Sequence, residues 1–252
     1  MNNLNFIGII PARYASTRFP GKPLAMIGNM TMIERVWRQA KKVLQQVYVA
    51  TDDTRIYDTV KAFGGDVVMT STNHHSGTDR CFEAYQTIGG NQDVIINIQG
   101  DEPFIQESQI IEIINCFNSP KTEIATLIRK FDPTKGFDAL FDPNTPKVVF
   151  DKELNAKYFS RSIIPYIRNH EHTQWLQKAT FYTHVGMYAY RSNTLAEITT
   201  LPQSQLELAE SLEQLRWIEN GYNIKVGITN CETIGIDTPQ DLQRAIALLS
   251  NQ

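Results

Sequence analysis

Short apolar runs alternate with stretches of helical periodicity in the first half of the chain, and this alternation is the strongest constraint on its fold. The strand-like runs are residues 6–10, 47–50, 66–69 and 93–98, and the helical stretches are residues 32–44, 54–63, 78–88 and 108–118. A helix that connects two strands of one sheet leaves those strands parallel. The sequence therefore predicts an α/β fold with a mostly parallel, doubly wound sheet and helices on both of its faces.

The pattern changes after about residue 125. The strand-like runs there are residues 147–150, 156–159 and 183–190, with Pro- and Asn-containing turns between them. No clear helix separates the first two of these runs, which favours antiparallel pairing. We expect one domain over residues 1–252, with an inserted antiparallel, strand-rich subdomain at about residues 145–191.

Helix, strand and helix return near the C-terminus, over residues 205–220, 225–228 and 239–250. Gly221 suits the end of the first helix and Pro239 the start of the last. Three glutamates would share one face of the first helix, and we expect that face to be solvated. They are Glu207, Glu210 and Glu213.

The composition is that of a folded protein without a strong overall charge. With 252 residues, 42% of them hydrophobic, the chain can bury a full core. Its 24 Lys and Arg against 27 Asp and Glu give a net charge of −3, so no overall positive field recruits nucleic acid or an anionic membrane. Residues 1–10 contain no long apolar stretch that would indicate a signal peptide or spanning helix, and we expect a cytoplasmic protein. The three cysteines lie far apart and outside any CxxC pattern, which argues against a disulfide framework.

A cationic loop, residues 11–24, directly follows the first predicted strand. It carries Arg13, Arg18 and Lys22. In an open α/β sheet, ligands bind beyond the carboxyl ends of the strands, and charged donors there suit a polyphosphate. The loop also contains Ser16, Thr17 and Gly21, which let a ligand approach the backbone closely, but it matches neither the Walker A nor the GxGxxG pattern. A solvated surface loop explains the same residues equally well.

Two acidic segments complement this loop. Asp101 lies in QGDEP, at the end of the run DVIINI, and Asp237 lies in GIDTP, before the last predicted helix. One or two carboxylates beside phosphate oxygens are typical of Mg²⁺ sites. Ordinary turn and helix-start chemistry remains the alternative for both segments.

Other polar residues are less specific. The segment SGTDR, residues 76–80, opens a helix, so an anion or base site competes with plain capping. We interpret His74, His75, His170 and His172 as solvated. His184 stands beside Gly186 in a predicted strand, where a ligand-binding role and a core role are both open. Six aromatic residues of the subdomain suggest either a subunit interface or core packing: Tyr158, Phe159, Phe181, Tyr182, Tyr188 and Tyr190.

Seven segments together resemble one known family. They are PARYASTRFPGKPL, HHSGTDR, NIQGDEP, YFSRSIIP, HVGMYAY, ESLEQLR and GIDTPQDL, in that order over essentially the whole chain. Each is modest alone, but the ordered set resembles the 3-deoxy-manno-octulosonate (Kdo) cytidylyltransferases, also called CMP-Kdo synthetases. The resemblance implies a Rossmann-like nucleotidyltransferase fold, a homodimer with the inserted subdomain at its interface, and no nucleic-acid or membrane partner.

The resemblance also implies an activity and its residues. CTP and Kdo would give CMP-Kdo and pyrophosphate for lipopolysaccharide biosynthesis, with Mg²⁺ on Asp101 and Asp237. The catalytic residues would be Arg13, Arg18, Lys22, Asp101 and Asp237. The nucleotide-binding residues would be Arg13, Ser16, Arg18, Lys22, Ser76, Gly77, Thr78, Arg80 and Asp101. The sugar-binding residues would be Gln99, Arg161, His184, Tyr188, Glu213 and Gln214.

Two other functions remain open from the sequence. The nucleotide motifs say nothing about the acceptor, so another acidic sugar, such as a sialic acid or an 8-amino Kdo analogue, is an alternative substrate. A non-catalytic nucleotide-binding module is the alternative from a different class, although it would need neither of the two predicted metal ligands.

Overall fold

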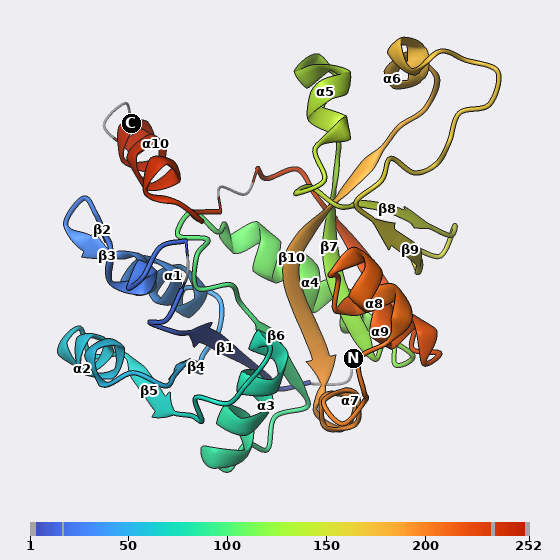
Figure 1. The fold of residues 1–252 in the computed structure, drawn as a ribbon. Helices are drawn as coiled ribbons and strands as arrows, with labels where there is room; N and C mark the ends of the chain where they lie inside the picture. The colour runs from blue at the N-terminus through green and yellow to red at the C-terminus, as the bar shows by residue number, and fades with distance from the viewer. Residues whose placement is uncertain (1–3, 17, 233–234, 250–252) are drawn as a thin grey trace. The chain divides into compact units, whose positions relative to one another are not determined.

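The computed structural model describes residues 4–16, 18–232 and 235–249. Thr17, which the sequence placed in the cationic loop, lies outside them. The chain forms two compact units. Unit 1 comprises Met1–Ile111, Ala189–Thr199 and Glu232–Gln252, and unit 2 comprises Glu112–Tyr188 and Thr200–Cys231. The course of the chain can be followed in Figure 1.

Unit 1 contains the predicted parallel sheet. Its strands are β1 (Phe6–Ala12), β4 (Val47–Thr51), β5 (Asp66–Met69) and β6 (Val94–Asn97). They run parallel in the order β6-β1-β4-β5, with Gly8 opposite Val47 on one side and Ile96 on the other. All four residues of β6 are buried, as the apolar run DVIINI predicted for a strand covered on both faces.

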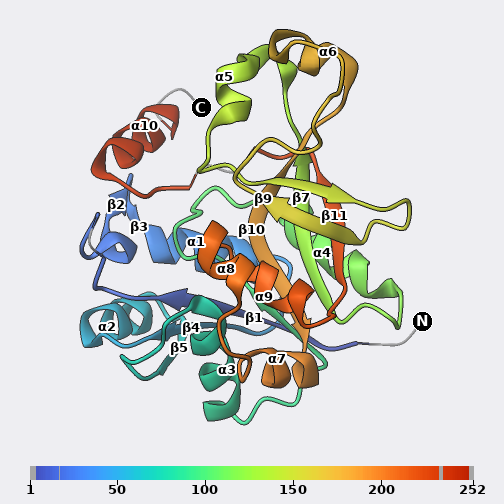
Figure 2. The same ribbon diagram turned by 45° about the vertical axis from the view of Figure 1, so that its right-hand side comes forward.

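The helices of unit 1 begin where side chains cap them. Thr31, Asp53 and Ser76 accept hydrogen bonds from the first-turn N–H groups of α1 (Met32–Lys41), α2 (Thr54–Ala62) and α3 (Gly77–Thr87). Figures 1 and 2 show α1 and α3 on opposite sides of β1, which confirms the doubly wound arrangement. The other elements of this unit are η1 (Lys22–Leu24), β2 (Met26–Ile27), β3 (Met30–Thr31), α7 (Ser192–Ile198) and α10 (Pro239–Leu249). The helix α4 (Glu107–Asn115) and the 3-10 turn η2 (Cys116–Asn118) follow β6 along the chain.

Unit 2 mixes parallel and antiparallel pairing. The strands β7 (Ile124–Lys130) and β11 (Ile224–Thr229) are parallel, whereas β8 (Lys147–Phe150) and β9 (Ala156–Ser160) are antiparallel. A further antiparallel pair joins β8 to β10 (Tyr182–Arg191) at Lys147 and Thr183. The antiparallel pairing predicted for this part of the chain is therefore confirmed. The sequence did not predict β7, although its first five residues are buried.

The smaller elements of unit 2 surround an aromatic cluster. They are η3 (Pro133–Lys135), α5 (Gly136–Phe141), η4 (His172–Gln174) and α6 (Trp175–Lys178). Phe131, Trp175 and Phe181 are buried at the centre of this cluster. His172, predicted to be solvated, stacks on Phe137 with ring centroids 5.5 Å apart. The bounds of the inserted subdomain, residues 145–191, stay a prediction.

The single helix predicted over residues 205–220 is wrong. Two short helices replace it, α8 (Gln205–Glu210) and α9 (Gln214–Glu219), because Ser211 adopts a left-handed conformation with φ 49°. A residue in this region ends a helix, and side chains other than glycine rarely adopt it. Gly221, with φ 85°, follows the second helix as predicted, and the last helix begins at Pro239 as predicted.

The solvated face predicted for the three glutamates is also wrong. Glu207 is buried, and its two carboxylate oxygens accept hydrogen bonds from Arg216 at 2.8 and 2.9 Å. Glu210 accepts from the hydroxyl of Ser160 and the N–H of Arg161. The helical periodicity could not reveal this, because Arg216 and Ser160, which bond these carboxylates, lie on other elements.

Most of the aromatic residues considered for an interface belong to the core. Phe159, Phe181, Tyr188 and Tyr190 are buried, which leaves Tyr158 and Tyr182 as the partly exposed members of that set. Cys81, Cys116 and Cys231 are all among the described residues and form no disulfide.

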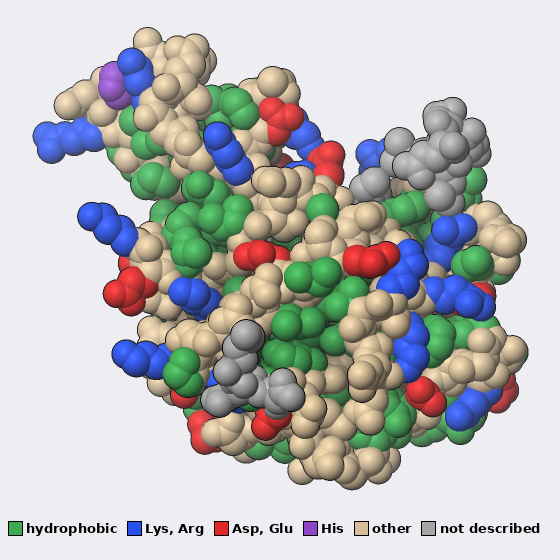
Figure 3. Space-filling view, turned by 180° about the vertical axis from the view of Figure 1, so that it is seen from behind, with side chains coloured by type: hydrophobic (Ala, Val, Ile, Leu, Met, Phe, Trp, Pro, Cys, Tyr) green, Lys and Arg blue, Asp and Glu red, His purple; other side chains and the backbone are tan. Residues whose placement is uncertain are grey.

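The surface and the helices agree with the composition. Side chains of both charge signs occur on the face shown in Figure 3, as expected for a net charge of −3. Among residues 4–16, 18–232 and 235–249, no helix is both long and apolar enough to cross a membrane.

The buried Glu207–Arg216 pair leads to a stability prediction. Glu207→Ala leaves the Arg216 guanidinium buried without its carboxylate and is expected to lower the free energy of unfolding by about 3 kcal/mol. The double variant Glu207→Leu/Arg216→Met removes both charges and should recover most of this loss. Urea denaturation followed by circular dichroism measures both.

Lys157→Ala is the matched control, since Lys157 forms an exposed ion pair with Asp151 in the same unit. It should cost less than about 1 kcal/mol. Equal losses for Glu207→Ala and Lys157→Ala would contradict the assignment of a buried, structurally important pair.

Candidate functional site

A cavity of about 280 Å³ lies in unit 1 at the carboxyl ends of β1 and β6. Four segments line it: the cationic loop after β1, the loop that enters α3, the turn after β6, and the segment before α10. The lining residues are Pro11, Ala12, Arg13, Ser16, Arg18, Lys22, Pro23, His74, His75, Ser76, Gly77, Arg80, Gln99, Gly100, Asp101 and Asp237. This is the edge of the sheet at which a doubly wound fold binds ligands.

The cationic loop is held in shape by Tyr14 and Gly21. Gly21 has φ 70°, and its N–H donates to the carbonyl of Tyr14 at 2.9 Å. A Cβ at this position would lie 3.0 Å from the Tyr14 ring, so the turn requires a glycine for both its conformation and its space. The guanidinium of Arg55 covers that ring, 3.3 Å from its centroid. The turn leads directly into η1, which begins at Lys22.

Lys22 is the centre of the charged side of the cavity. Its Nζ lies 2.6 Å from Oδ2 of Asp101 and 3.1 Å from Oδ1 of Asp237. Arg18 contacts the other carboxylate oxygen of Asp237 at 3.1 Å. The structure thus brings together the cationic loop and both acidic segments that the sequence singled out.

Backbone contacts explain why the two carboxylates meet. The N–H of Ile236 donates to the carbonyl of Asp101 at 3.0 Å, which ties the segment before α10 to the turn after β6. The Ile236 side chain is fully buried in a cluster with Ile27 and Met32. Gly100 allows the turn itself to pass close to β1, since a Cβ there would lie 3.0 Å from the carbonyl oxygen of Pro11.

The carboxylates suit a hard divalent cation. Two acidic side chains already converge on one ammonium group, so their position accepts positive charge. Among the described residues no cluster of three or more His, Cys, Asp and Glu could hold a metal ion. A site with two carboxylates fits Mg²⁺, which completes its six oxygen ligands with phosphate and water.

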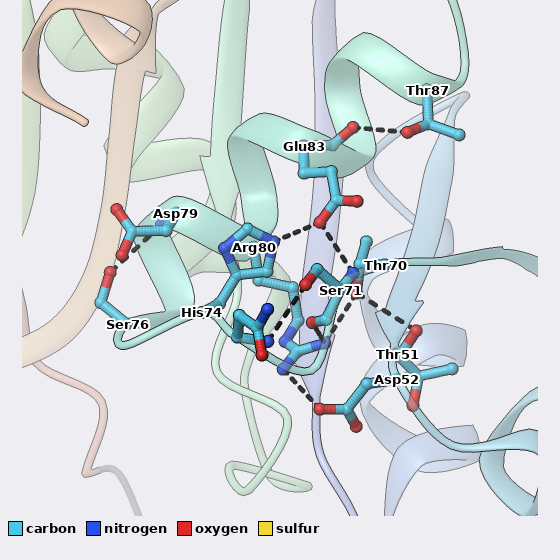
Figure 4. A network of polar contacts seen from close by, with 11 residues as sticks. Thr51, Asp52, Thr70, Ser71, His74, Ser76, Asp79, Arg80, Glu83 and Thr87 are labelled. Carbon is cyan, nitrogen blue, oxygen red and sulfur yellow. Dashed lines mark hydrogen bonds and ion pairs between the residues drawn. The ribbon is translucent and has the colours of Figure 1, made fainter. Parts of the chain in front are cut away.

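The helix α3 supplies the other wall of the cavity. Ser76 and Gly77 line it, whereas Thr78 is buried with its hydroxyl 3.4 Å from that of Tyr190. Arg80 lines it as well, but its side chain is only 5% exposed. Figure 4 shows the Arg80 guanidinium directed at Asp52 and at the segment that contains Thr70 and Ser71.

His74 and His75 also line the cavity, although sequence reasoning had interpreted both as solvated. The Nε2 atom of His74 forms a hydrogen bond to the carboxylate of Glu83, nine residues away on α3. The sequence signals for a site role were their adjacency to SGTDR and their place in the segment HHSGTDR, which carries part of the family resemblance.

Five of the residues predicted to bind the sugar belong to unit 2, while Gln99 lines the cavity of unit 1. His184 and Tyr188 lie on β10 with their ring centroids 5.3 Å apart. Burial lowers the pKa of His184 to about 4. Burial and the charge of Glu213 raise the pKa of Tyr188 well above its ordinary value. Both rings are therefore uncharged at neutral pH.

The hydroxyl of Thr126 defines which nitrogen of His184 carries the proton. It donates to the carbonyl of Met187 at 2.8 Å, so it must accept from Nε2 of His184, which lies 2.9 Å away. The other ring nitrogen, Nδ1, is then the hydrogen-bond acceptor of a neutral imidazole.

Arg161 is fixed by backbone carbonyls at the break between α8 and α9. Its guanidinium donates to the carbonyls of Pro143, Glu210 and Ser211. These partners use three of its five N–H groups, so two donors remain for a ligand. Gln214 is 3% exposed, and its Nε2 has no hydrogen-bond partner in the part of the chain that the structure describes. A buried amide donor of this kind indicates a ligand or an ordered water.

Comparison with known proteins agrees with this arrangement. A family model described as cytidylyltransferase matches residues 7–226. The chain belongs to the Kdo cytidylyltransferase family. The 3-deoxy-manno-octulosonate cytidylyltransferase of Parabacteroides distasonis is 64% identical over 99% of this chain and 100% of its own. That of Bacteroides thetaiotaomicron is 61% identical over 99% and 100%.

Among solved structures, CMP:2-keto-3-deoxy-manno-octonic acid synthetase complexed with CTP is similar, with a TM-score of 0.90 and 40% identity. The similarity covers 98% of this chain and 99% of that one. As a member of this family, the protein is a nucleotidyltransferase, and the fold predicted from the sequence is confirmed.

The lowered pKa of His184 leads to a prediction of pH dependence. Below pH 6.5 the unfolded chain binds a proton at this histidine, whereas the folded protein does so only near pH 4. The free energy of unfolding should therefore fall as the pH is lowered from 6.5 to 4, by on the order of 2 kcal/mol from this group. Chemical denaturation at a series of pH values measures it.

His184→Gln is the control for the other titrating groups. Glutamine keeps a hydrogen-bonding side chain but does not titrate in this range. The free energy of unfolding of this variant should therefore fall less between pH 6.5 and 4, by the amount attributed to His184. Identical profiles for both proteins would contradict a depressed pKa.

Proposed function

We propose that the protein transfers CMP from CTP to the anomeric hydroxyl of Kdo and releases pyrophosphate. The convergence of Lys22, Arg18, Asp101 and Asp237 at one edge of the sheet carries this proposal. The names of the similar proteins support it from an independent direction. The product would supply Kdo in activated form to lipopolysaccharide biosynthesis in the cytoplasm.

The charged side of the cavity would bind the triphosphate of CTP. Arg13, Arg18 and Lys22 present three cations there, and Ser16 lies in the same loop. In this reaction the attacking hydroxyl and the departing pyrophosphate lie in line about the α-phosphorus. The cations hold the triphosphate in that geometry and stabilise the negative charge that develops on the leaving group.

Asp101 and Asp237 would hold Mg²⁺. Bound there, the metal supplies Lewis-acid polarisation of the phosphate and lowers the pKa of a coordinated hydroxyl. The two carboxylates themselves keep Lys22 in the cavity through its contacts at 2.6 and 3.1 Å. Removal of either carboxylate would therefore disturb the position of the lysine as well as the metal.

The predicted sugar-binding residues of unit 2 would bind the sugar acid, and the same role is proposed for Gln99 of unit 1. The two remaining donors of Arg161 suit the carboxylate of Kdo. Nδ1 of His184 would accept from a sugar hydroxyl, and Nε2 of Gln214 would donate to a sugar oxygen. Tyr188 and Glu213 complete the proposed sugar-binding set. The nucleotide side would include Ser76, Gly77, Thr78 and Arg80.

A homodimer is part of the proposal and rests on the family resemblance. With four of the six subdomain aromatics buried in the core, the interface would have to use Tyr158, Tyr182 or other surface residues. No membrane or nucleic-acid partner is proposed.

Pyrophosphate release from CTP tests the proposal. With Mg²⁺ and Kdo present, the purified protein should release pyrophosphate continuously, and release should stop when either Kdo or the metal is omitted. The same assay with a sialic acid or 8-amino Kdo tests the other acceptors. Binding of CTP without turnover of any of these sugars would instead support a non-catalytic nucleotide-binding module.

Asp101→Asn serves as the inactive control in this assay. It removes a proposed metal ligand at nearly constant volume and should reduce turnover by about a thousandfold. Asp66→Asn changes an exposed carboxylate of the same unit and should leave turnover unchanged. Near-normal turnover of Asp101→Asn would remove Asp101 from the metal site.

The buried amide of Gln214 gives a separate prediction for the sugar side. Gln214→Met keeps the volume but removes a donor that lacks a partner, so the unfolding temperature should stay the same or rise. The KM for Kdo should increase about tenfold, because the lost donor would otherwise bond the sugar, while the KM for CTP stays constant.

Gln109→Met is the matched control for this variant. Gln109 lies in α4, and its Nε2 is likewise buried without a partner among the described residues. It should leave both KM values unchanged. An unchanged KM for Kdo in Gln214→Met would exclude Gln214 from the sugar site.

A further inference from the structure

Different segments supply the charged and the uncharged lining of the cavity in unit 1. This difference indicates where the phosphates and the nucleoside of a nucleotide would lie. Arg13, Arg18 and Lys22 attract phosphate on one side. The wall at the start of α3 includes Ser76 and Gly77, which carry no charge, and Arg80, whose charge is paired with that of Asp52 at 2.8 Å. Phosphates bound to the first side leave the nucleoside against the second.

Residues 74–76 of this second wall belong to a segment, residues 70–76, that has no regular secondary structure of its own. Ser71 is held at both of its backbone groups. Its N–H donates to Oε2 of Glu83 at 2.8 Å, and its carbonyl accepts from Nη1 of Arg80 at 3.3 Å. The same Arg80 nitrogen donates to the Thr70 hydroxyl at 2.6 Å.

Glu83 also holds His74. Oε2, the oxygen that accepts from the Ser71 N–H, is the partner of His74 Nε2 (Figure 4). Although partial burial acts to raise the pKa of Glu83, the hydrogen bonds from His74 and Ser71 lower it overall. The carboxylate is therefore ionised at neutral pH and accepts both bonds, so Nε2 of His74 carries a proton.

Helix geometry places both holding groups on one face of α3. Arg80 and Glu83 are three residues apart, so their side chains lie next to each other along the helix. The same helix begins at Gly77, which lines the cavity. The helix α3 thus supplies Gly77 to the wall and also holds the irregular segment that precedes it.

We infer that Glu83 is a positioning residue for nucleotide binding, which acts by holding His74 and Ser71 so that residues 74–76 form the wall against which the nucleoside lies. This inference rests on the proposed function, because the ligand is CTP. Without Glu83 the segment would spend only part of its time in the binding conformation. If the binding conformation were populated about one tenth of the time, the dissociation constant of CTP would rise about tenfold.

Direct binding tests the inference without reference to turnover. Isothermal titration with CTP and with inorganic pyrophosphate, each in the presence of Mg²⁺, separates the two sides of the cavity. Glu83→Ala should weaken CTP binding about tenfold and leave pyrophosphate binding within about twofold of the unmodified protein, because pyrophosphate contacts only the cationic side. Glu83→Gln keeps an oxygen acceptor and should restore CTP binding to within about threefold.

His74→Ala provides a second variant in a surface loop, in case Glu83→Ala does not fold. It should weaken CTP binding but not pyrophosphate binding. In the double variant the loss should be smaller than the sum of the two single losses, since both variants remove the His74–Glu83 bond. Arg38→Ala breaks an exposed ion pair with Glu34 in the same unit and should change neither titration.

The outcomes separate the inference from the proposed function. Normal CTP binding by Glu83→Ala or His74→Ala overturns the inference alone, and so does an equal loss of CTP and pyrophosphate binding, which would indicate general damage. Failure of the unmodified protein to bind CTP overturns both.

Discussion

The parallel pairing of β1 with β4 and β6 is the constraint on which unit 1 depends. A central strand of a parallel sheet is covered by helices on both faces, so charged residues lie beyond its ends, and ligands bind at the carboxyl ends. The apolar run of β1 accordingly stops at Ala12, and Arg13 begins the cationic loop. Because β6 runs parallel to β1, Asp101 follows the neighbouring strand at the same edge. The direction of the two strands therefore explains why the cationic loop and Asp101 lie at the same edge of the sheet.

Strand direction alone does not bring the third charged segment to this edge. Asp237 is 215 residues from Lys22 in sequence, and its position depends on Ile236. The backbone of Ile236 is bonded to Asp101, and its side chain is buried beside Ile27 and Met32. Burial of Ile236 therefore fixes the position of Asp237 without using hydrogen bonds of the Asp237 carboxylate.

The sequence predicted the elements of unit 1 well, because each has a clear period and a chemical start signal. It failed where one residue or one distant partner decides the structure. Ser211 ends α8 although the apolar period continues through it, and nothing in the local pattern marks a left-handed serine. His74 resembled a solvated residue because its partner, Glu83, lies one element further along the chain. The charged residues of the site could be predicted from their place after β1 and β6, whereas the sugar-side residues were identified only through the family resemblance.

The two proposed groups of site residues would bind ligands of different charge. A triphosphate carries several negative charges, and in the proposed function the cationic loop would meet it with Arg18 and Lys22, which are paired with carboxylates. A sugar acid carries one charge and many hydroxyls, so excess charge in its site would cost desolvation without adding selectivity. The proposed sugar-binding set of unit 2 contains a neutral imidazole, a neutral phenol, an amide and the carboxylate of Glu213, and its one guanidinium, that of Arg161, is held by carbonyls. Carbonyl partners orient Arg161 without cancelling its charge, which would leave that charge available for the carboxylate of the proposed acceptor.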